Sequence, residues 1–334
     1  MDFASAAVRA ACTGTFLFCA ASFGNAATFT TFDPEGSVFT LPYAINDSGA
    51  ITGYYVASGK GHGFLRAPDG TITTFDPPGS EITTPMAIDD NGRICGYWTN
   101  KHRTHEHAFL RNADGTFVLF DPPHATQSFA YDFDGKGNIV GAFAGRIIKS
   151  SGFVRAKSGK ITVFDYPGAL ATSVTAVNRS GTISGLYVDS QYVYHGLIRT
   201  RDGTMTSFDV PEGVGTAADG INDDGVITGE YFNAQEADHG YVRATDGTIT
   251  TFDPQQATDT TPADIDAAGA ITGLFQTSDG VNHGFLRKPA ATIVRFDVPD
   301  AADTDPKAIN KHGVITGGFT TSGHTQLHGF VRAP

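Results

Sequence analysis

Six histidines recur at regular intervals along this chain, and a ring of imidazoles could bind metal ions. If Asp69-Gly70 forms a two-residue turn, Gly63 lies opposite Asp76 and His62 lies one step away, within reach of a hydrogen bond. We interpret such pairs as links between neighbouring strands, because the same position in separate repeats is too distant to share one ion. The pairs are His62–Asp76, His107–Asp121, His195–Asp209, His239–Asp253, His283–Asp297 and His328–Asp33, and Ser151 replaces the histidine in the remaining repeat.

A denser group of ionisable residues lies in a predicted loop. Its three imidazoles could supply nitrogen ligands for Zn²⁺ or Cu²⁺, and they belong to His102, His105 and His107. Lys101 and Arg103 lie among them and repel a cation. The alternative is a solvated loop without metal, and no cofactor is predicted for the chain.

A repeat must position all of these side chains. The motif is Phe-Asp followed by proline one or two residues later, and it recurs at intervals of 43, 45, 44, 44, 44 and 44 residues, at Phe32, Phe75, Phe120, Phe164, Phe208, Phe252 and Phe296. A constant period of this length indicates an array of one supersecondary unit.

One unit of the array contains four short β-rich runs. In residues 42–77 these runs alternate with the turn signals at 46–49 and 69–70, which predicts a four-stranded antiparallel meander. No stretch shows helical periodicity over ten residues. Four strands in about 44 residues make a propeller blade, so seven units predict an all-β, seven-bladed β-propeller.

The two ends of the chain indicate how the propeller closes. The chain ends at residues 328–334 with a third strand that has no fourth strand after it, whereas residues 28–33 form a fourth strand with no blade before it. We expect the N-terminal strand to complete the last blade, which leaves no sheet edge between the first and last blades. The prediction is a single propeller domain over residues 27–334.

The repeated motifs resemble a known family. His-Gly-Phe-Leu-Arg, Asp-Gly-Thr, Phe-Asp-x-Pro and Ile-Asn-x-x-Gly-x-Ile-Thr-Gly are similar to the bacterial "probable extracellular repeat" proteins of the HAF type. The resemblance covers essentially all of residues 27–334. It implies secretion and a propeller-like array, and it brings no catalytic residues with it.

Residues 1–26 lie outside the repeat and have the features of a secretory signal peptide. Arg9 gives a sparse positive start, residues 10–23 are apolar, and residues 24–26 are small. The apolar stretch is too short to span a bilayer, so no membrane insertion is expected. The mature protein is therefore predicted to be periplasmic or extracellular.

Charge and cysteine content narrow the classes of partner. With 23 basic and 35 acidic residues the net charge is −12, which argues against binding to nucleic acid or to an anionic membrane. Outside residues 1–26 the only cysteine is Cys95, so no intrachain disulfide can form, and we expect a small buried side chain there. A monomer is expected.

Several other side chains recur in every repeat and are expected to be scaffold. The repeated arginines should hydrogen-bond to turn carbonyls or to the turn Asn and Asp residues; they are Arg66, Arg111, Arg155, Arg199, Arg243, Arg287 and Arg332. The repeated aromatic residues should pack between blades; they are Tyr55, Trp98, Phe143, Tyr187, Tyr231, Phe275 and Phe319. The Asn or Asp residues that precede Gly by three places are expected in turns and not in calcium loops.

One position of the repeat varies freely, so it is the best candidate for a specific site. It lies two places before the last apolar residue of each first strand and holds Tyr43, Met86, Tyr131, Thr175, Asp219, Ala263 and Lys307. Asp132 and Asp264 follow in two of the repeats. If these side chains face the central channel, they form an asymmetric ring suited to a small molecule or glycan. The alternative is a water-filled channel with no ligand.

A second candidate rim combines carboxylates with tyrosines. Glu230, Glu236 and Asp238 belong to one repeat, and Tyr192 and Tyr194 belong to its neighbour. Carboxylates beside a cleft can act as general acids and bases, but their separation cannot be read from sequence.

The function expected from these patterns is a secreted binding or interaction module with one ligand site at the channel face. Its partner would be a carbohydrate, a small molecule or a protein. Whether the protein is an enzyme stays open, since the sequence has no nucleophile elbow, phosphate loop or dinucleotide motif. The alternatives are a polysaccharide hydrolase or lyase at the channel mouth, and a lectin with one site per blade.

Overall fold

The computed structural model describes residues 27–101, 105–145, 150–323 and 326–334. These residues form 28 strands in six sheets, and five of the sheets have four strands. No described residues form a helix long and apolar enough to cross a membrane. The predicted signal peptide, residues 1–26, lies outside the described residues.

The first half of the chain forms three strand groups. The eight-stranded sheet contains two meanders, which a single parallel pairing of Gly61 with Ile82 joins. The strands of its first meander are β2 (Phe39–Ile45), β3 (Ile51–Ala57), β4 (Lys60–Arg66) and β5 (Ile72–Phe75). Those of its second meander are β6 (Ser80–Ile88), β7 (Ile94–Asn100), β8 (Glu106–Arg111) and β9 (Phe117–Phe120). The next sheet contains β10 (Ala125–Phe133), β11 (Ile139–Gly145), β12 (Ser150–Arg155) and β13 (Ile161–Phe164).

The second half of the chain repeats the same meander. One sheet contains β14 (Ala171–Val177), β15 (Ile183–Val188), β16 (Tyr194–Arg199) and β17 (Met205–Phe208). The next contains β18 (Gly215–Ile221), β19 (Ile227–Phe232), β20 (Asp238–Arg243) and β21 (Ile249–Phe252). The next contains β22 (Ala257–Ile265), β23 (Ile271–Thr277), β24 (Asn282–Arg287) and β25 (Ile293–Phe296).

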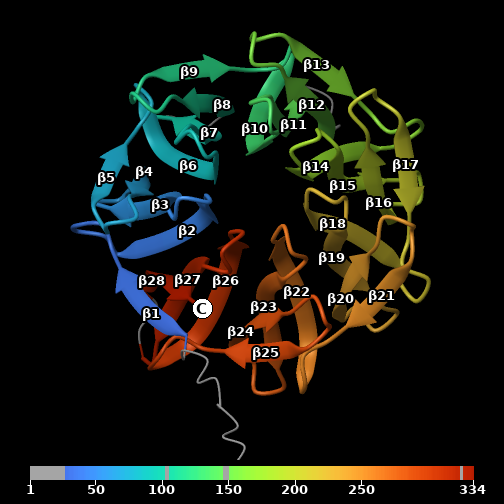
Figure 1. The fold of residues 1–334 in the computed structure, drawn as a ribbon. Helices are drawn as coiled ribbons and strands as arrows, with labels where there is room; N and C mark the ends of the chain where they lie inside the picture. The colour runs from blue at the N-terminus through green and yellow to red at the C-terminus, as the bar shows by residue number, and fades with distance from the viewer. Residues whose placement is uncertain (1–26, 102–104, 146–149, 324–325) are drawn as a thin grey trace, which may run out of the picture.

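The last sheet joins the two ends of the chain. It contains β1 (Thr28–Phe32), β28 (Leu327–Ala333), β27 (Ile315–Thr321) and β26 (Ala301–Ile309), in that order. β1 pairs antiparallel with β28, from Thr28 opposite Ala333 to Phe32 opposite Gly329, which is the partner expected from the sequence. The sheets stand around a common axis, with β2, β6, β10, β14, β18, β22 and β26 nearest to it (Figure 1).

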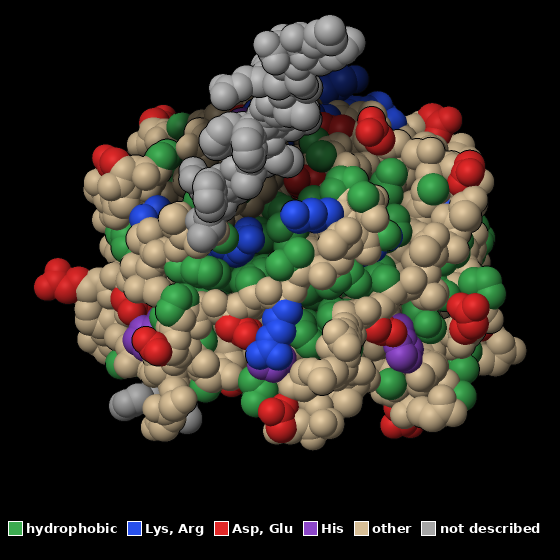
Figure 2. All heavy atoms as spheres, turned by 60° about the horizontal axis from the view of Figure 1, so that its bottom comes forward, with side chains coloured by type: hydrophobic (Ala, Val, Ile, Leu, Met, Phe, Trp, Pro, Cys, Tyr) green, Lys and Arg blue, Asp and Glu red, His purple; other side chains and the backbone are tan. Residues whose placement is uncertain are grey.

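The repeated histidines pair with aspartates as predicted. The Nδ1···Oδ distances lie between 2.6 and 3.0 Å in all six pairs, and Ser151 donates to Asp165 at 2.8 Å. Figure 2 shows histidines beside acidic side chains at several separate places around the outside of the ring. These contacts hold the third strand of each four-stranded group against its fourth strand.

The turn before each of these aspartates differs from the prediction by one residue. Gly63 lies opposite Phe75, so His62 lies directly opposite Asp76. The hairpin contains a three-residue loop because the amide of Ala67 donates to the carbonyl of Thr71 and Gly70 adopts a φ of 93°. The two-residue turn predicted at Asp69-Gly70 was therefore wrong, although the pairing it was meant to explain is present.

The repeated arginines connect neighbouring strand groups. Each guanidinium lies over the phenylalanine that ends the preceding group, at 4.5–5.0 Å from the ring centroid. Only long hydrogen bonds of 3.4–3.5 Å to the next carbonyl are described, from Arg111, Arg199 and Arg243. The predicted hydrogen bonds to turn carbonyls are thus described for three of the arginines, and all seven also make a cation–π contact with the preceding strand group.

The other expected scaffold side chains are buried or partly buried. Six of the aromatic residues of the second strands, which were expected to pack between blades, pack on the histidine ring of their own strand group, with centroids 4.9–5.3 Å apart. Cys95 is fully buried and free, and burial raises the pKa of its thiol. The Asn and Asp side chains accept hydrogen bonds from amides of their own turns, as Asn46 does from Ala50 at 2.9 Å.

Candidate functional site

The variable position of the repeat is a β-bulge in every innermost strand. In each case the register with the second strand shifts around that one residue, which leaves it unpaired. A glycine of the second strand faces the residue before the bulge; a Cβ on Gly53 would lie 2.2 Å from the carbonyl oxygen of Leu41. The close backbone approach requires this glycine, and the bulged side chain is left free to vary. All seven bulged residues are partly exposed: Tyr43, Met86, Tyr131, Thr175, Asp219, Ala263 and Lys307.

Aromatic side chains gather along one arc of the ring. The rings of Tyr43 and Tyr54 are stacked, with centroids 6.1 Å apart. Phe129 stacks on Tyr131 at 6.2 Å and meets Tyr97 edge-on at 5.0 Å. Burial raises the pKa of Tyr43 and raises that of Tyr131 to about 12, so both phenols stay protonated at neutral pH.

A cavity of about 460 Å³ opens beside this arc, between β2–β4 and β6–β8. We call it the tyrosine pocket and define it by five of its lining residues, Tyr43, Tyr54, Tyr97, Thr99 and Glu106. Thr99 is only 7% exposed, and no described residue forms a hydrogen bond with its hydroxyl oxygen. The hydroxyl oxygen is inaccessible to solvent, so it does not offer a hydrogen bond to a molecule in the cavity.

Charged groups border the tyrosine pocket. The carboxylate of Glu106 accepts a hydrogen bond of 2.5 Å from Gln127, and Lys60 pairs with Glu81 at 3.5 Å. On the neighbouring strand β26, Lys307 pairs with Asp305 at 2.8 Å. Burial raises the pKa of Asp305, and its second oxygen has no partner among the described residues.

A carboxylate group lies on another arc, at sheet β18–β21. Asp219 is the bulged residue of β18, and no described residue hydrogen-bonds to its Oδ2. Glu230 lies on β19, opposite Ala217. Burial and the nearby charge of Glu230 raise the pKa of Asp219, while burial and Asp238 raise that of Glu230 to about 7. Of the predicted rim, Glu230 thus holds a carboxyl group that can carry a proton near neutral pH.

Asp132 and Asp264 join neighbouring strand groups. Asp132 accepts hydrogen bonds from its neighbour Phe133 and, at 2.9 Å, from the amide of Val177. Asp264 does the same with Ile265 and, at 2.9 Å, with Ile309. Burial raises the pKa of each carboxyl to about 7 despite these bonds, and the charge of Asp132 adds to the effect on Asp264. Each of the two oxygens of both carboxylates thus accepts a hydrogen bond from a backbone amide.

The remaining predicted residues contribute less. Met86 is partly exposed at its bulge in β6. His105 and His107 have ring centroids 6.3 Å apart, and His107 bonds to Asp121, while His102 lies outside the described residues. Within the described ranges, no three His, Cys, Asp or Glu side chains are grouped as a metal site would require.

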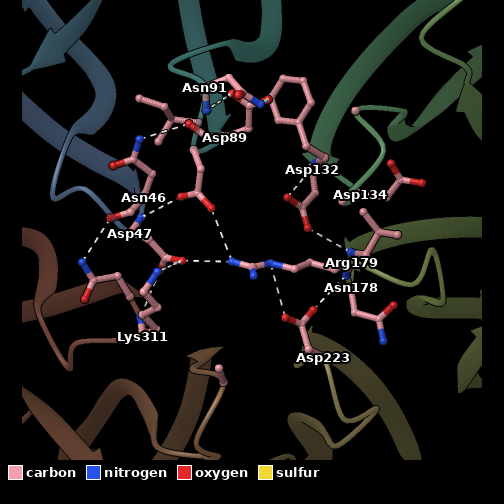
Figure 3. A pocket seen from close by; sticks show the side chains of 18 of the residues that line it. Asn46, Asp47, Asp89, Asn91, Asp132, Asp134, Asn178, Arg179, Asp223 and Lys311 are labelled. Atoms are coloured by element: carbon pink, nitrogen blue, oxygen red, sulfur yellow. Dashed lines mark hydrogen bonds and ion pairs between the residues drawn. The ribbon is translucent and has the colours of Figure 1, made fainter.

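The opposite end of the ring carries a feature that the sequence analysis missed. A cavity of about 860 Å³ is lined by the first turns of all the strand groups, so it lies on the ring axis. The guanidinium of Arg179 extends across it to Asp47 at 2.9 Å, Asp223 at 3.3 Å and Asp90 at 3.4 Å (Figure 3). Lys311 also pairs with Asp47, at 2.8 Å.

A signal for this feature was present in the sequence. The residue after each turn Asn or Asp varies as freely as the bulged residue, and it holds Asp47, Asp90, Gly135, Arg179, Asp223, Ala267 and Lys311. The turn assignment placed this position at the surface but did not indicate that these turns converge. Arg179 and its ion pairs lie in the cavity at the turns after the first strands. The tyrosine pocket opens at the opposite end of the same hairpins.

Comparison with known proteins supports the fold. No protein-family model matches the sequence, and no curated protein matches it either, so the HAF-type resemblance is not confirmed. Among solved structures, virginiamycin B lyase from Staphylococcus aureus, an inactive H270A variant with quinupristin, is 17% identical. The match covers 92% of this chain and 100% of that one, with a TM-score of 0.62.

Two protease structures are similar to the same extent. The β-propeller domain of the Trilobed protease from Pyrococcus furiosus, described with an open velcro topology, is 10% identical over 87% of this chain and 95% of that one, with a TM-score of 0.64. A prolyl endopeptidase is 12% identical over 90% of this chain and 51% of that one, with a TM-score of 0.63. At such low identity these matches show a β-propeller fold and carry no activity with them.

Proposed function

We propose that this chain is a closed, seven-bladed β-propeller that binds one small molecule or glycan in the tyrosine pocket. The seven four-stranded meanders supply the blades, and the pairing of β1 with β28 supports closure. A hydrogen bond of Asn310 further supports closure. Its side-chain amide donates to the carbonyl of Asn46 at 3.1 Å and so links the turn after β26, in the last strand group, to the turn after β2, in the first.

The aromatic wall of the tyrosine pocket is the observation that carries this proposal. Tyr43, Tyr54 and Tyr97 line a cavity between two meanders, and a concave aromatic wall of this kind suits a small ligand. Two tyrosines of its wall do not recur in the other repeats. Tyr54 and Tyr97 follow the second-strand glycine, and the other strand groups have Ala142, Leu186, Glu230, Leu274 and Gly318 at that position. The proposal is therefore one site per molecule.

The lining suits a sugar or another compact polar ligand. A volume of about 460 Å³ lies in the range of small-molecule pockets. Aromatic faces can pack against the apolar face of a ring, while Glu106 can accept hydrogen bonds from hydroxyl groups and Lys60 can donate them. Secretion through residues 1–26 would place such a module among extracellular glycans, and it remains part of the proposal.

A ligand screen tests this site directly. We expect a mono- or oligosaccharide to raise the melting temperature of the protein, because a ligand that binds only the folded state stabilises it. Titration calorimetry should then give a stoichiometry near one. Tyr54→Ala and Tyr97→Ala should each weaken binding at least tenfold, whereas Leu186→Ala, at the same strand position in β15, should leave it unchanged.

Two outcomes would overturn the proposed site. A stoichiometry near seven would instead indicate a lectin with one site per blade. Binding that is unchanged in Tyr54→Ala and Tyr97→Ala, with both variants folded by circular dichroism, would remove the tyrosine pocket from consideration.

A polysaccharide hydrolase or lyase is the second candidate. The carboxyl groups of Asp219 and Glu230 favour it, because Glu230 has a pKa of about 7 and can donate or accept a proton near neutral pH. The enzyme proposal would be established if the protein turned over a polysaccharide, if Glu230→Gln abolished that turnover, and if Tyr97→Ala retained it. Turnover that survives Glu230→Gln would exclude this pair as its acid and base.

A further inference from the structure

A second surface of the ring, distant in sequence from the tyrosine pocket, combines exposed apolar and acidic side chains. Four large apolar side chains are exposed at the loop ends of β14–β17 and β18–β21: Leu170 by 40%, Tyr192 by 77%, Tyr194 by 45% and Val214 by 57%. Glu212, before β18, and Glu236, between β19 and β20, are exposed as well, and Asp238 is partly exposed. We call these seven residues the loop patch.

Three residues of the loop patch are linked across two neighbouring sheets. The amide of Leu170 donates to the carbonyl of Val188, and Val188 lies opposite Tyr194. The ring of Tyr194 meets Phe232 of the next sheet edge-on at 6.3 Å. Val214 then donates its amide to the carbonyl of Phe232 at 2.8 Å. Figure 1 shows the loops β15–β16 and β19–β20 on adjacent sheets of the ring.

The sequence around the loop patch has acidic residues and no basic counterpart. Residues 166–173, 186–196, 206–217 and 230–240 contain no Lys or Arg. They contain Asp189, Asp209, Glu212, Glu230, Glu236 and Asp238. His195 pairs with Asp189 and Asp209, so the other four carboxyl groups have no described ion pair. The charge of this surface is complementary to a cation.

Two side chains of the loop patch occupy backbone positions that favour glycine. Tyr192 has a φ of 65° and Glu236 a φ of 63°, and each closes a tight loop with a hydrogen bond of 3.1 Å to the residue three places earlier. The corresponding loop of the next sheet has Gly280 there, with a φ of 81° and the same bond at 2.8 Å. Such a position costs conformational energy, and five other non-glycine residues of the described chain share it: Ser58, His124, Gln256, Ala291 and Asp300.

We propose that the loop patch binds an extended, lysine- or arginine-bearing segment of a partner protein. The faces of Tyr192 and Tyr194 attract a guanidinium or ammonium group through cation–π contact. Glu212, Glu236 and Asp238 pair with further basic side chains, and Leu170 and Val214 contact the intervening apolar ones. This site is independent of the tyrosine pocket, which is built from β2–β4 and β6–β8.

A pair of charge-reversed peptides tests the loop patch. The probes are fluorescent decapeptides of alternating arginine and valine or of alternating glutamate and valine, and their anisotropy is measured with the full chain. We expect the basic peptide to bind at 20 mM NaCl and to bind at least tenfold more weakly at 300 mM, because salt screens exposed charge pairs. The acidic peptide should not bind.

Variants separate the loop patch from general attraction to an acidic protein. Tyr192→Ala, Tyr194→Ala and Glu236→Gln should each weaken binding several-fold, and the triple variant at least thirtyfold. Val214→Ser should weaken it too. Val38→Ser is the matched control, since Val38 is exposed and donates its amide to the carbonyl of Val56 as Val214 does to Phe232.

The expected result is loss of binding in the triple variant with retained folding by circular dichroism and full binding in Val38→Ser. Equal binding of wild type and triple variant would overturn the proposal. The proposal would also be overturned if the triple variant no longer bound a neutral oligosaccharide but still bound the basic peptide, because the loop patch would then recognise glycans.

Discussion

The contribution of strand β1 to stability can be measured by truncating Phe32. Its ring meets Phe64 edge-on at 5.8 Å, and the guanidinium of Arg66 lies 5.0 Å from its centroid. Its tip faces Gly329, where an added Cβ would lie 2.8 Å from Cζ. Phe32→Ala therefore removes contacts of β1 with the first meander and with β28.

The expected cost follows from the burial of this ring. Truncating a buried phenylalanine to alanine costs about 3–5 kcal/mol, and Phe32 is partly buried, which places it at the low end of that range. The lost edge-to-face and cation–π contacts act in the same direction, by roughly 0.5–1.5 kcal/mol each. We expect Phe32→Ala to lower the free energy of unfolding by about 3 kcal/mol.

Phe252 is a matched control for this measurement, since it makes the same contacts between sheets that are consecutive in sequence. It meets Phe285 at 5.8 Å, lies 5.0 Å below Arg287 and faces Gly240. Urea unfolding followed by circular dichroism should give the same loss for both alanine variants within about 1 kcal/mol. A loss of about 3 kcal/mol in Phe252→Ala with none in Phe32→Ala would show that β1 does not dock, and the argument for ring closure would fail.

Two further predictions concern the glycine that faces the bulge and a buried carboxyl. Gly229→Ala should cost more than about 3 kcal/mol because its Cβ would lie 2.1 Å from the backbone oxygen of Ala217, whereas Gly240→Ala, which meets only a phenyl ring, should cost about 1–2 kcal/mol in the same urea assay. Equal costs would contradict this reasoning. The pKa of Asp264 is about 7 in the folded state, so the folded protein keeps a proton that the unfolded chain loses, and stability falls as pH rises from 4 to 7. Asp264→Asn should therefore gain stability relative to wild type across this window, and a pH-independent difference would refute the assigned pKa.

Much of the fold could be read from the sequence because its signals are local. The Phe-Asp period, the turn residues and the alternating apolar runs predict four strands per unit without knowledge of distant contacts. The histidine–aspartate pairs followed from the same spacing. The hairpin register was off by one residue, because it depends on the left-handed φ of Gly70, and a two-residue and a three-residue loop share the same sequence signal.

The candidate site was predictable only as a list of positions. Free variation at Tyr43, Tyr131, Asp219 and Lys307 marked a place that the repeat does not dictate, and the bulge explains why. The sequence could not indicate that Thr99 lies in the same cavity, since Thr99 occupies an ordinary strand position.

The sequence by itself determined the all-β repeat, its four-stranded unit and the partner of the N-terminal strand, since each depends on spacing along the chain. Only the tertiary structure decided which variable residues meet. It places the tyrosines of two meanders around one pocket. It also brings the carboxylate of Asp132 within hydrogen-bond distance of the amide of Val177, and Arg179 within ion-pair distance of carboxylates from three other strand groups. These contacts depend on how the sheets converge on a common axis, and local sequence carries no record of that convergence.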